Sequence, residues 1–316
     1  MKQLFYFILL LAGFSSVHSC KDLLDDDGNP LVDLNNTGGL IGPRALYREI
    51  TDADTIAEYQ YNGLLLSKVL SSGVAAGKPK SITDIMYSGD KVSKINFNGY
   101  LDLDDNGSID TDSVSYTQLF TYGNSGRLET ISENRSIYRR PPIVPPATTP
   151  NPMALLRKSK TLYSLEYSTT TSKLETITMR NGPDASGIPF AYTDYSKTTY
   201  TYLGDNISRA ERNYGPMTGG VFGTATERYG YDFSSYDTQI SPFTLLPMAY
   251  KISRLLSTER NDAESFILSP NSPKRLSVSD LTLPIPAPVI QTTNYSYDPQ
   301  TYMTKGLGVN YIYKPL

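Results

Sequence analysis

Residues 121–131 constrain the fold more than any other stretch of the chain, because they read as one β-hairpin. An aromatic strand runs into a turn containing Gly123, Asn124 and Gly126, and a strand with apolar residues follows. Gly and Asn accept the positive φ that tight hairpin turns require. The segment therefore predicts two antiparallel strands joined by a short turn.

Variants of this hairpin recur along the chain. They share Tyr-x-Tyr, a turn of Gly, Asn or Asp, a basic residue, then Leu or Val and often Ile three residues later. The intervals are irregular, which indicates hairpins of variable arm length rather than the coils of a solenoid. Successive hairpins build an antiparallel meander with alternate residues on opposite faces. The repeats lie at residues 58–63, 86–95, 121–131, 165–177, 200–207, 229–232 and 295–298.

These repeats predict an all-β fold, a large curved antiparallel meander of successive β-hairpins that forms a single domain over residues 45–316. Helical periodicity is nearly absent, and only residues 153–158 suggest a short helix. The Pro-rich segment 139–152 cannot donate ladder hydrogen bonds. We expect it to be an insertion within the domain, because the hairpins continue on both sides of it.

Residues 1–19 have the order of a lipoprotein signal peptide. A positive charge precedes an apolar run at residues 4–14, which is too short to cross a membrane as a helix. Ser19 then precedes Cys20, the single cysteine of the chain. This order resembles a bacterial lipobox, although Val17 stands where Leu is usual. The resemblance implies that Cys20 is lipidated; the alternative is an ordinary secretory signal with an incidental cysteine.

Residues 20–44 predict a flexible tether, since acidic sequence with Gly and Pro favours a solvated chain. Lys21, Asp22 and the acids that follow also resemble the surface-export signal of Bacteroidota lipoproteins. The resemblance implies a protein attached to the outer membrane through its N-terminal lipid and facing the cell exterior. The alternative is a spacer on the periplasmic side.

The composition excludes several function classes. A net charge of −3 argues against a nucleic-acid partner. His18 is the only histidine and precedes Cys20, so the mature chain lacks the residues of Ser-His-Asp and Cys-His catalysis. No Gly-rich loop leads from a strand into a helix to hold phosphate. We therefore expect no enzyme and no required cofactor; a carboxylate-dependent glycosidase, with an Asp/Glu pair about 5 to 10 Å apart, is the remaining catalytic alternative.

The hairpins resemble the Tyr-Asp repeats of Rhs-like proteins, and more closely a group of uncharacterised Bacteroidota lipoproteins. Residues 229–232, 241–243, 268–272, 295–298 and 311–313 follow the C-terminal order of that group, with Ser241 in place of the usual Asn. The resemblance implies a porin-like curved sheet with no established activity. The strands are rich in Ser, Thr, Asp and Glu, which does not fit a barrel embedded in lipid.

An acidic segment at residues 102–113 is the sharpest local motif. Its spacing of oxygen ligands around Gly107 matches a calcium-binding loop, but Ser113 stands where a bidentate Glu is usual. The alternative is a bare acidic hairpin tip with no metal. The candidate Ca²⁺ ligands are Asp102, Asp104, Asn106, Asp110 and Asp112.

Thr55 and Ser113 each follow an Asp and precede an apolar residue, a short pattern of O-glycosylation in these bacteria. Three-residue patterns also arise by chance, so an unmodified residue is the alternative at both positions.

The chain holds 25 Tyr and no Trp. Tyrosines on the concave face could hold a glycan or an apolar ligand; the alternative is that tyrosine pairs across strands stabilise the sheet. We expect a lipid-anchored, non-catalytic envelope protein that acts as a surface binding or structural module, with a glycan or an envelope protein as partner. The alternative is a periplasm-facing lipoprotein that assists outer-membrane assembly or transport. The tyrosines concerned are Tyr59, Tyr61, Tyr122, Tyr167, Tyr200 and Tyr202.

Overall fold

The computed structural model describes residues 44–73, 77–104, 108–142, 149–259 and 261–315. It confirms the expected all-β meander, as one antiparallel sheet of 18 strands with two short helical segments. The helical segments are α2 (Met248–Leu255) and the 3₁₀ helix η2 (Asn261–Leu268). The strands are β1 (Arg44–Ile50), β2 (Thr55–Asn62), β3 (Leu65–Ser71), β4 (Ser81–Ser88), β5 (Lys91–Tyr100), β6 (Ser113–Tyr122), β7 (Leu128–Arg139), β8 (Ala154–Tyr167), β9 (Leu174–Pro183), β10 (Asp194–Leu203), β11 (Asn206–Thr218), β12 (Val221–Phe222), β13 (Glu227–Tyr236), β14 (Pro273–Asp280), β15 (Val289–Thr292), β16 (Ser296–Tyr297), β17 (Met303–Gly306) and β18 (Val309–Pro315).

The sheet curves back on itself. Strands β1 to β11 pair in chain order, β11 pairs with β13, and β13 to β15 continue the order. The last strand, β18, pairs with the first, β1. Among the described residues, β15 pairs with β14 and β16 pairs with β17, with no register between β15 and β16, so the sheet is open at that point.

Five of the hairpins have a β-bulge next to the turn. In the β4–β5 hairpin, Met86 opposes Lys94 and Tyr87 opposes Val92, so Ser93 is an extra residue. Side chains of a regular strand alternate, and two residues three apart would face opposite sides. The extra residue returns Val92 and Ile95 to the same inner face, where they are 2% and 0% exposed. Equivalent register shifts precede Tyr61, Tyr122, Tyr167 and Tyr202.

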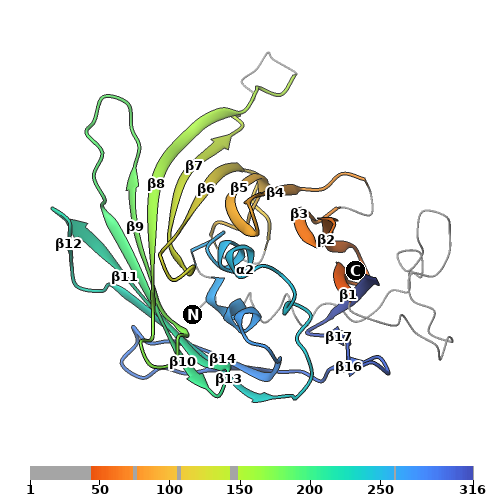
Figure 1. Cartoon of the computed structure of the whole chain (residues 1–316). Coiled ribbons are helices and arrows are strands. Elements are labelled where there is room, and N and C mark those ends of the chain that lie inside the picture. Colours follow the sequence, from red (N-terminus) through yellow and green to blue (C-terminus); the bar gives the residue numbers. More distant parts are fainter. Residues whose placement is uncertain (1–43, 74–76, 105–107, 143–148, 260, 316) are drawn as a thin grey trace.

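The helical segments fill the concave side of the sheet (Figure 1). We call residues 241–259 and 261–272 the plug. Ile252 and Leu255 of α2 are fully buried against the inner face of the sheet. Tyr59 of β2 meets Tyr250 edge-on, with ring centroids 6.3 Å apart. The main core therefore lies between the sheet and the plug.

Two expectations about local structure are wrong. Residues 153–158 do not form a helix: β8 covers nearly all of them, because its backbone groups pair with β7 on one side and β9 on the other. Residues 229–232 are not a hairpin turn and lie inside β13, between β11 and β14. A Cβ on Gly230 would lie 2.8 Å from Arg209 Nη2, the end of a flexible side chain, and 3.1 Å from Leu281 Cδ1.

Candidate functional site

The concave tyrosines are part of the framework. Tyr59 and Tyr200 are buried in the core. Tyr61, Tyr122 and Tyr202 are partly buried and pack against the same core. These rings are already covered by protein, which favours the cross-strand alternative over an open ligand surface.

A repeated hydrogen bond joins consecutive hairpins. Most of these tyrosines lie near the end of one strand and donate the hydroxyl proton to a backbone carbonyl near the start of an earlier strand; Tyr295 lies between β15 and β16, and Tyr313 bonds within the β17–β18 hairpin. Tyr122, for example, donates to the carbonyl of Val92 at 2.9 Å. We call these residues the tyrosine ladder: Tyr61, Tyr87, Tyr122, Tyr167, Tyr202, Tyr236, Tyr295 and Tyr313.

The basic residue of the repeat has a matching role. Lys91 lies over the ring of Tyr122, with its Nζ 5.2 Å from the centroid. Lys173 lies in the same way over Tyr202, at 5.3 Å. Cations at this distance are attracted by the face of the ring. The Tyr, basic and Leu/Val positions of the repeat therefore form one joint between neighbouring hairpins.

Burial changes the acidity of the ladder. It raises the pKa of the Tyr87, Tyr167 and Tyr236 hydroxyls to about 12. Burial penalises the charged phenolate, so these groups stay protonated and remain hydrogen-bond donors.

Three polar contacts fix the plug to different parts of the sheet. In the first, Arg254 of α2 pairs with Glu49 of β1 at 2.9 Å and with Glu264 of the plug at 2.8 Å. Tyr59 also donates a hydrogen bond to Glu49. Arg254 therefore engages both carboxylates.

The second contact joins the plug to β6 and β7. Arg135 donates to Glu133 at 2.8 Å and to the Ser257 carbonyl at 2.9 Å. Ser253 of α2 donates to the amide oxygen of Gln118, which is fully buried.

The third contact joins η2 to β10 and β11. Arg212 and Asp262 form a buried ion pair with a Nε–Oδ2 distance of 2.7 Å. Arg212 also donates to the Thr198 hydroxyl and to the carbonyl of Glu259. Burial raises the pKa of the Asp262 carboxyl, and the charge of Arg212 opposes that shift. A buried ion pair with this many hydrogen bonds holds its geometry tightly.

The tip of the plug separates two cavities. The larger has a volume of about 350 Å³ and lies between the plug and the inner face of β7 to β11. The smaller, of about 240 Å³, lies on the other side of the tip against β2 to β6. Polar side chains line much of the larger one: Arg157, Thr161, Asn181, Asp194, Tyr214 and Glu259. The smaller has an aromatic wall, where Phe97 stacks on Tyr116 at 4.8 Å.

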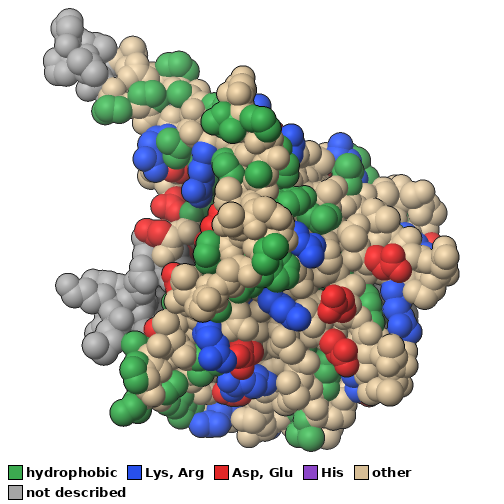
Figure 2. All heavy atoms as spheres, turned by 90° about the vertical axis from the view of Figure 1, so that its left-hand side faces the viewer, with side chains coloured by type: hydrophobic (Ala, Val, Ile, Leu, Met, Phe, Trp, Pro, Cys, Tyr) green, Lys and Arg blue, Asp and Glu red, His purple; other side chains and the backbone are tan. Residues whose placement is uncertain are grey.

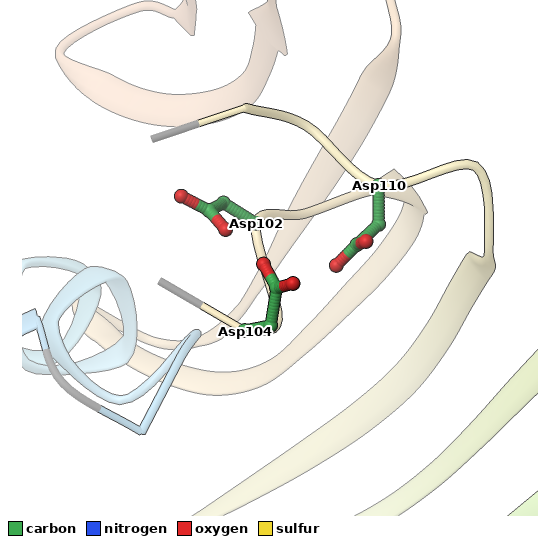
Figure 3. Close-up of side chains that lie close together, drawn as sticks. All are labelled: Asp102, Asp104 and Asp110. Carbon is green, nitrogen blue, oxygen red and sulfur yellow. The ribbon is translucent and has the colours of Figure 1, made fainter. Parts of the chain in front are cut away.

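Three of the five candidate calcium ligands lie together. Carboxylate oxygens of Asp102, Asp104 and Asp110 are within 4.8 Å of one another, in the loop between β5 and β6 (Figure 3). Asp112 faces elsewhere, because Arg139 pairs with it at 2.7 Å and lowers the pKa of its carboxyl. Asn106 lies outside the described residues.

Three predicted modification sites remain: Cys20, Thr55 and Ser113. Cys20, with the tether up to residue 43, lies outside the described residues. Thr55 begins β2 and is 1% exposed. Ser113 begins β6 and is half-buried.

The arginines that fix the plug were not found from the sequence. The contacts between the plug and the sheet join residues that are far apart along the chain: Arg135 with Ser257, Arg212 with Asp262, and Arg254 with Glu49. No local sequence pattern identifies these arginines.

Comparisons with known proteins add two distant structures. No family model matches the sequence, and no curated protein matches it. A porin-like protein from Bacteroides vulgatus ATCC 8482 aligns over 87% of this chain and all of its own, with a TM-score of 0.44 and 10% identity. A porin-like protein from Bacteroides uniformis ATCC 8492 aligns over 70% of this chain and 96% of its own, with a TM-score of 0.21 and 13% identity. At these values the functional argument rests on the geometry of this chain. Among the described residues, no helix is long and apolar enough to cross a membrane.

Proposed function

We propose that this chain is a lipid-anchored cell-envelope protein that binds a glycan beside the plug, without catalysis. The observation that carries the proposal is the cavity of about 350 Å³ between the plug tip and β7 to β11. Its volume lies in the range of small-ligand sites.

The chemistry of the cavity suits a sugar. Hydroxyl and amide groups of Thr161 and Asn181 provide donors and acceptors, and Tyr163 and Tyr214 provide aromatic surface. Arg157 is exposed within the lining and could pair with an acidic substituent. The cavity is built on strands and on a plug held by buried ion pairs, which supports a preformed site.

The absence of catalysis is part of the proposal. Glu49 and Glu264 both line the smaller cavity, but Arg254 binds both of them. Charge-assisted hydrogen bonds to a shared arginine hold both carboxylates in place, so this pair suits structure better than glycoside hydrolysis.

Titration calorimetry with defined polysaccharides tests the ligand class. We expect the chain to bind at least one of polygalacturonate, dextran and yeast mannan, and Arg157→Ala to weaken binding at least fivefold. Lys197→Ala is the matched control, because Lys197 is an exposed cation on the outer face of β10. If the chain binds none of the three, or if both variants behave alike, the cavity is not the glycan site. A release of reducing ends during the titration would contradict the non-catalytic role.

Protease shaving of intact cells tests the location. We expect the wild-type protein to be cut while a periplasmic marker survives, and Cys20→Ala to release the protein from the membrane. Protection in intact cells, with cleavage only after permeabilisation, would instead favour a periplasm-facing role in outer-membrane assembly or transport. Unchanged membrane attachment of Cys20→Ala would refute lipidation.

A further inference from the structure

Large apolar side chains are exposed at one end of the outer face of the sheet. We call Leu155, Leu156, Ile188, Phe190, Val221 and Phe222 the apolar ledge. Ile188 and Val221 are 69% and 70% exposed, and the other four are between 38% and 50% exposed. Figure 2 shows hydrophobic and basic side chains gathered in the upper part of this face.

Two loops build the ledge by folding back over the sheet. The loop after β9 crosses the outer face at Gly182, where a Cβ would lie 2.0 Å from the Ala191 carbonyl oxygen. The end of β11 folds back in the same way at Gly215, where a Cβ would lie 2.6 Å from the ring of Tyr195. Phe222 then stacks on Tyr195 at 4.6 Å. Gly182 and Gly215 allow the loops to approach the sheet this closely, and the folded-back loops hold the apolar side chains of the ledge towards solvent.

Cations surround the ledge. Apart from Arg157, which lines the inner cavity, the described residues between 139 and 160 include four Lys and Arg and no Asp or Glu, in a chain with a net charge of −3. Lys160 lies 5.4 Å from the ring centroid of Phe190, and Arg180 lies 5.3 Å from that of Phe222. Two carboxylates pair with these cations: Asp184 pairs with Lys160, and Asp112 pairs with Arg139.

The rest of the same face has a different character. Further along β11 and β13 the outer side chains are charged and paired with each other. Arg209 pairs with Asp232 at 2.7 Å, and Arg228 pairs with Glu211 at 2.8 Å. The apolar ledge is therefore confined to one end of this part of the outer face of the sheet.

We propose that the apolar ledge docks on an anionic lipid surface. Exposed aliphatic and aromatic groups insert at the boundary between headgroups and acyl chains, and adjacent Lys and Arg add attraction to anionic headgroups. The excess of cations favours a lipid surface of negative charge over a neutral protein groove. Residues 20–43 could span at most about 80 Å if fully extended, so a lipid on Cys20 would not keep the ledge from the same membrane.

Vesicle sedimentation tests the proposal with the full mature chain carrying Cys20→Ala, so that lipidation does not contribute. We expect the chain to bind phosphatidylglycerol vesicles at least tenfold more tightly than phosphatidylcholine vesicles. Ile188→Asp with Val221→Asp should lower that affinity at least tenfold. Lys158→Glu should lower it for the anionic vesicles and leave the weak binding to phosphatidylcholine unchanged.

The matched control is Leu64→Asp with Leu203→Asp. These leucines are 72% and 75% exposed, and they lie at hairpin turns at the opposite end of the strands. The control should bind like the parent, and thermal melts should show that all variants fold. The proposal is overturned if the parent does not bind anionic vesicles or if the control loses as much affinity as the ledge variant. A concentration-dependent dimer that Ile188→Asp abolishes would also overturn it, because a second copy would then cover the ledge.

Discussion

Removing one hydroxyl from the tyrosine ladder should weaken the whole sheet. In Tyr167→Phe the ring stays in place over the β7–β8 joint, and only the 2.9 Å hydrogen bond to the carbonyl of Leu128 is lost. Arg127 can still lie over the ring, as it does at 5.6 Å in the native protein. The substitution therefore isolates the hydrogen bond from the packing.

The expected loss is about 1 kcal/mol in the free energy of unfolding, the typical net value of one intramolecular hydrogen bond. For a domain of this size that corresponds to a fall of roughly 2–4 °C in Tm. Equivalent tyrosines are two strands apart, or roughly 9.6 Å, and substitutions at that distance add. Combining the Phe substitutions at Tyr122, Tyr167 and Tyr202 should therefore cost about 3 kcal/mol.

Equilibrium unfolding in urea, followed by far-UV circular dichroism, measures these losses. The matched control is Tyr138→Phe, since Tyr138 is also a half-buried strand tyrosine but its hydroxyl makes no hydrogen bond within the described residues. The control should change the free energy of unfolding by less than about 0.5 kcal/mol, as expected where no hydrogen bond is lost. If the single and triple ladder variants lose no more than the control, the ladder does not hold the hairpins together.

Three further predictions concern pH, the plug and calcium. Burial raises the pKa of Tyr167 and Tyr236 from about 10 in the unfolded chain to about 12 in the folded one. The stability that this shift provides is therefore complete below pH 10 and is lost as the pH rises towards 12. The urea midpoint of unfolding should fall across that window and stay constant from pH 8 to 9. Arg212→Met leaves the buried carboxylate of Asp262 without its ion pair and should cost about 3–5 kcal/mol, whereas adding Asp262→Leu should restore most of the loss; equal losses in the single and double variants would contradict the ion pair's role. If the acidic loop binds calcium without a bidentate Glu, its affinity should be in the 10⁻⁴–10⁻³ M range, and 5 mM CaCl₂ should raise Tm by about 2 °C in the native chain and not in Asp104→Asn; no rise in the native chain would leave the bare acidic tip.

The hairpins were predictable because their signals are local. Gly63, Gly89 and Gly204 have positive φ at the turns where the sequence placed them. A turn residue and the strands on either side of it lie within about a dozen positions, so a pattern of residue types is enough to identify them. The order of the meander follows from such turns.

The plug was not predictable in the same way. The helix α2 has only eight residues, and six of them are buried, including the polar residues Lys251 and Ser253, so its burial does not follow the polar and apolar pattern of its sequence. Its contacts are long-range: Arg254 reaches Glu49 from 205 positions away along the chain. The cavities depend on where this segment sits, and so the candidate site could not be derived before the plug was known.

The spacing of apolar residues in the repeat predicts more than the alternation of a regular strand. In the repeat, an apolar residue follows another by three positions, as Leu128 precedes Ile131 and Leu174 precedes Ile177. A regular strand would place the members of each pair on opposite faces, one of them in water. All four residues are at most 7% exposed, because Glu129 and Glu175 are the extra residues of β-bulges. Where a tyrosine ends the strand before a turn and such a pair follows the turn, a spacing of three therefore predicts a bulge, and with it the position of the ladder tyrosine on the opposing strand.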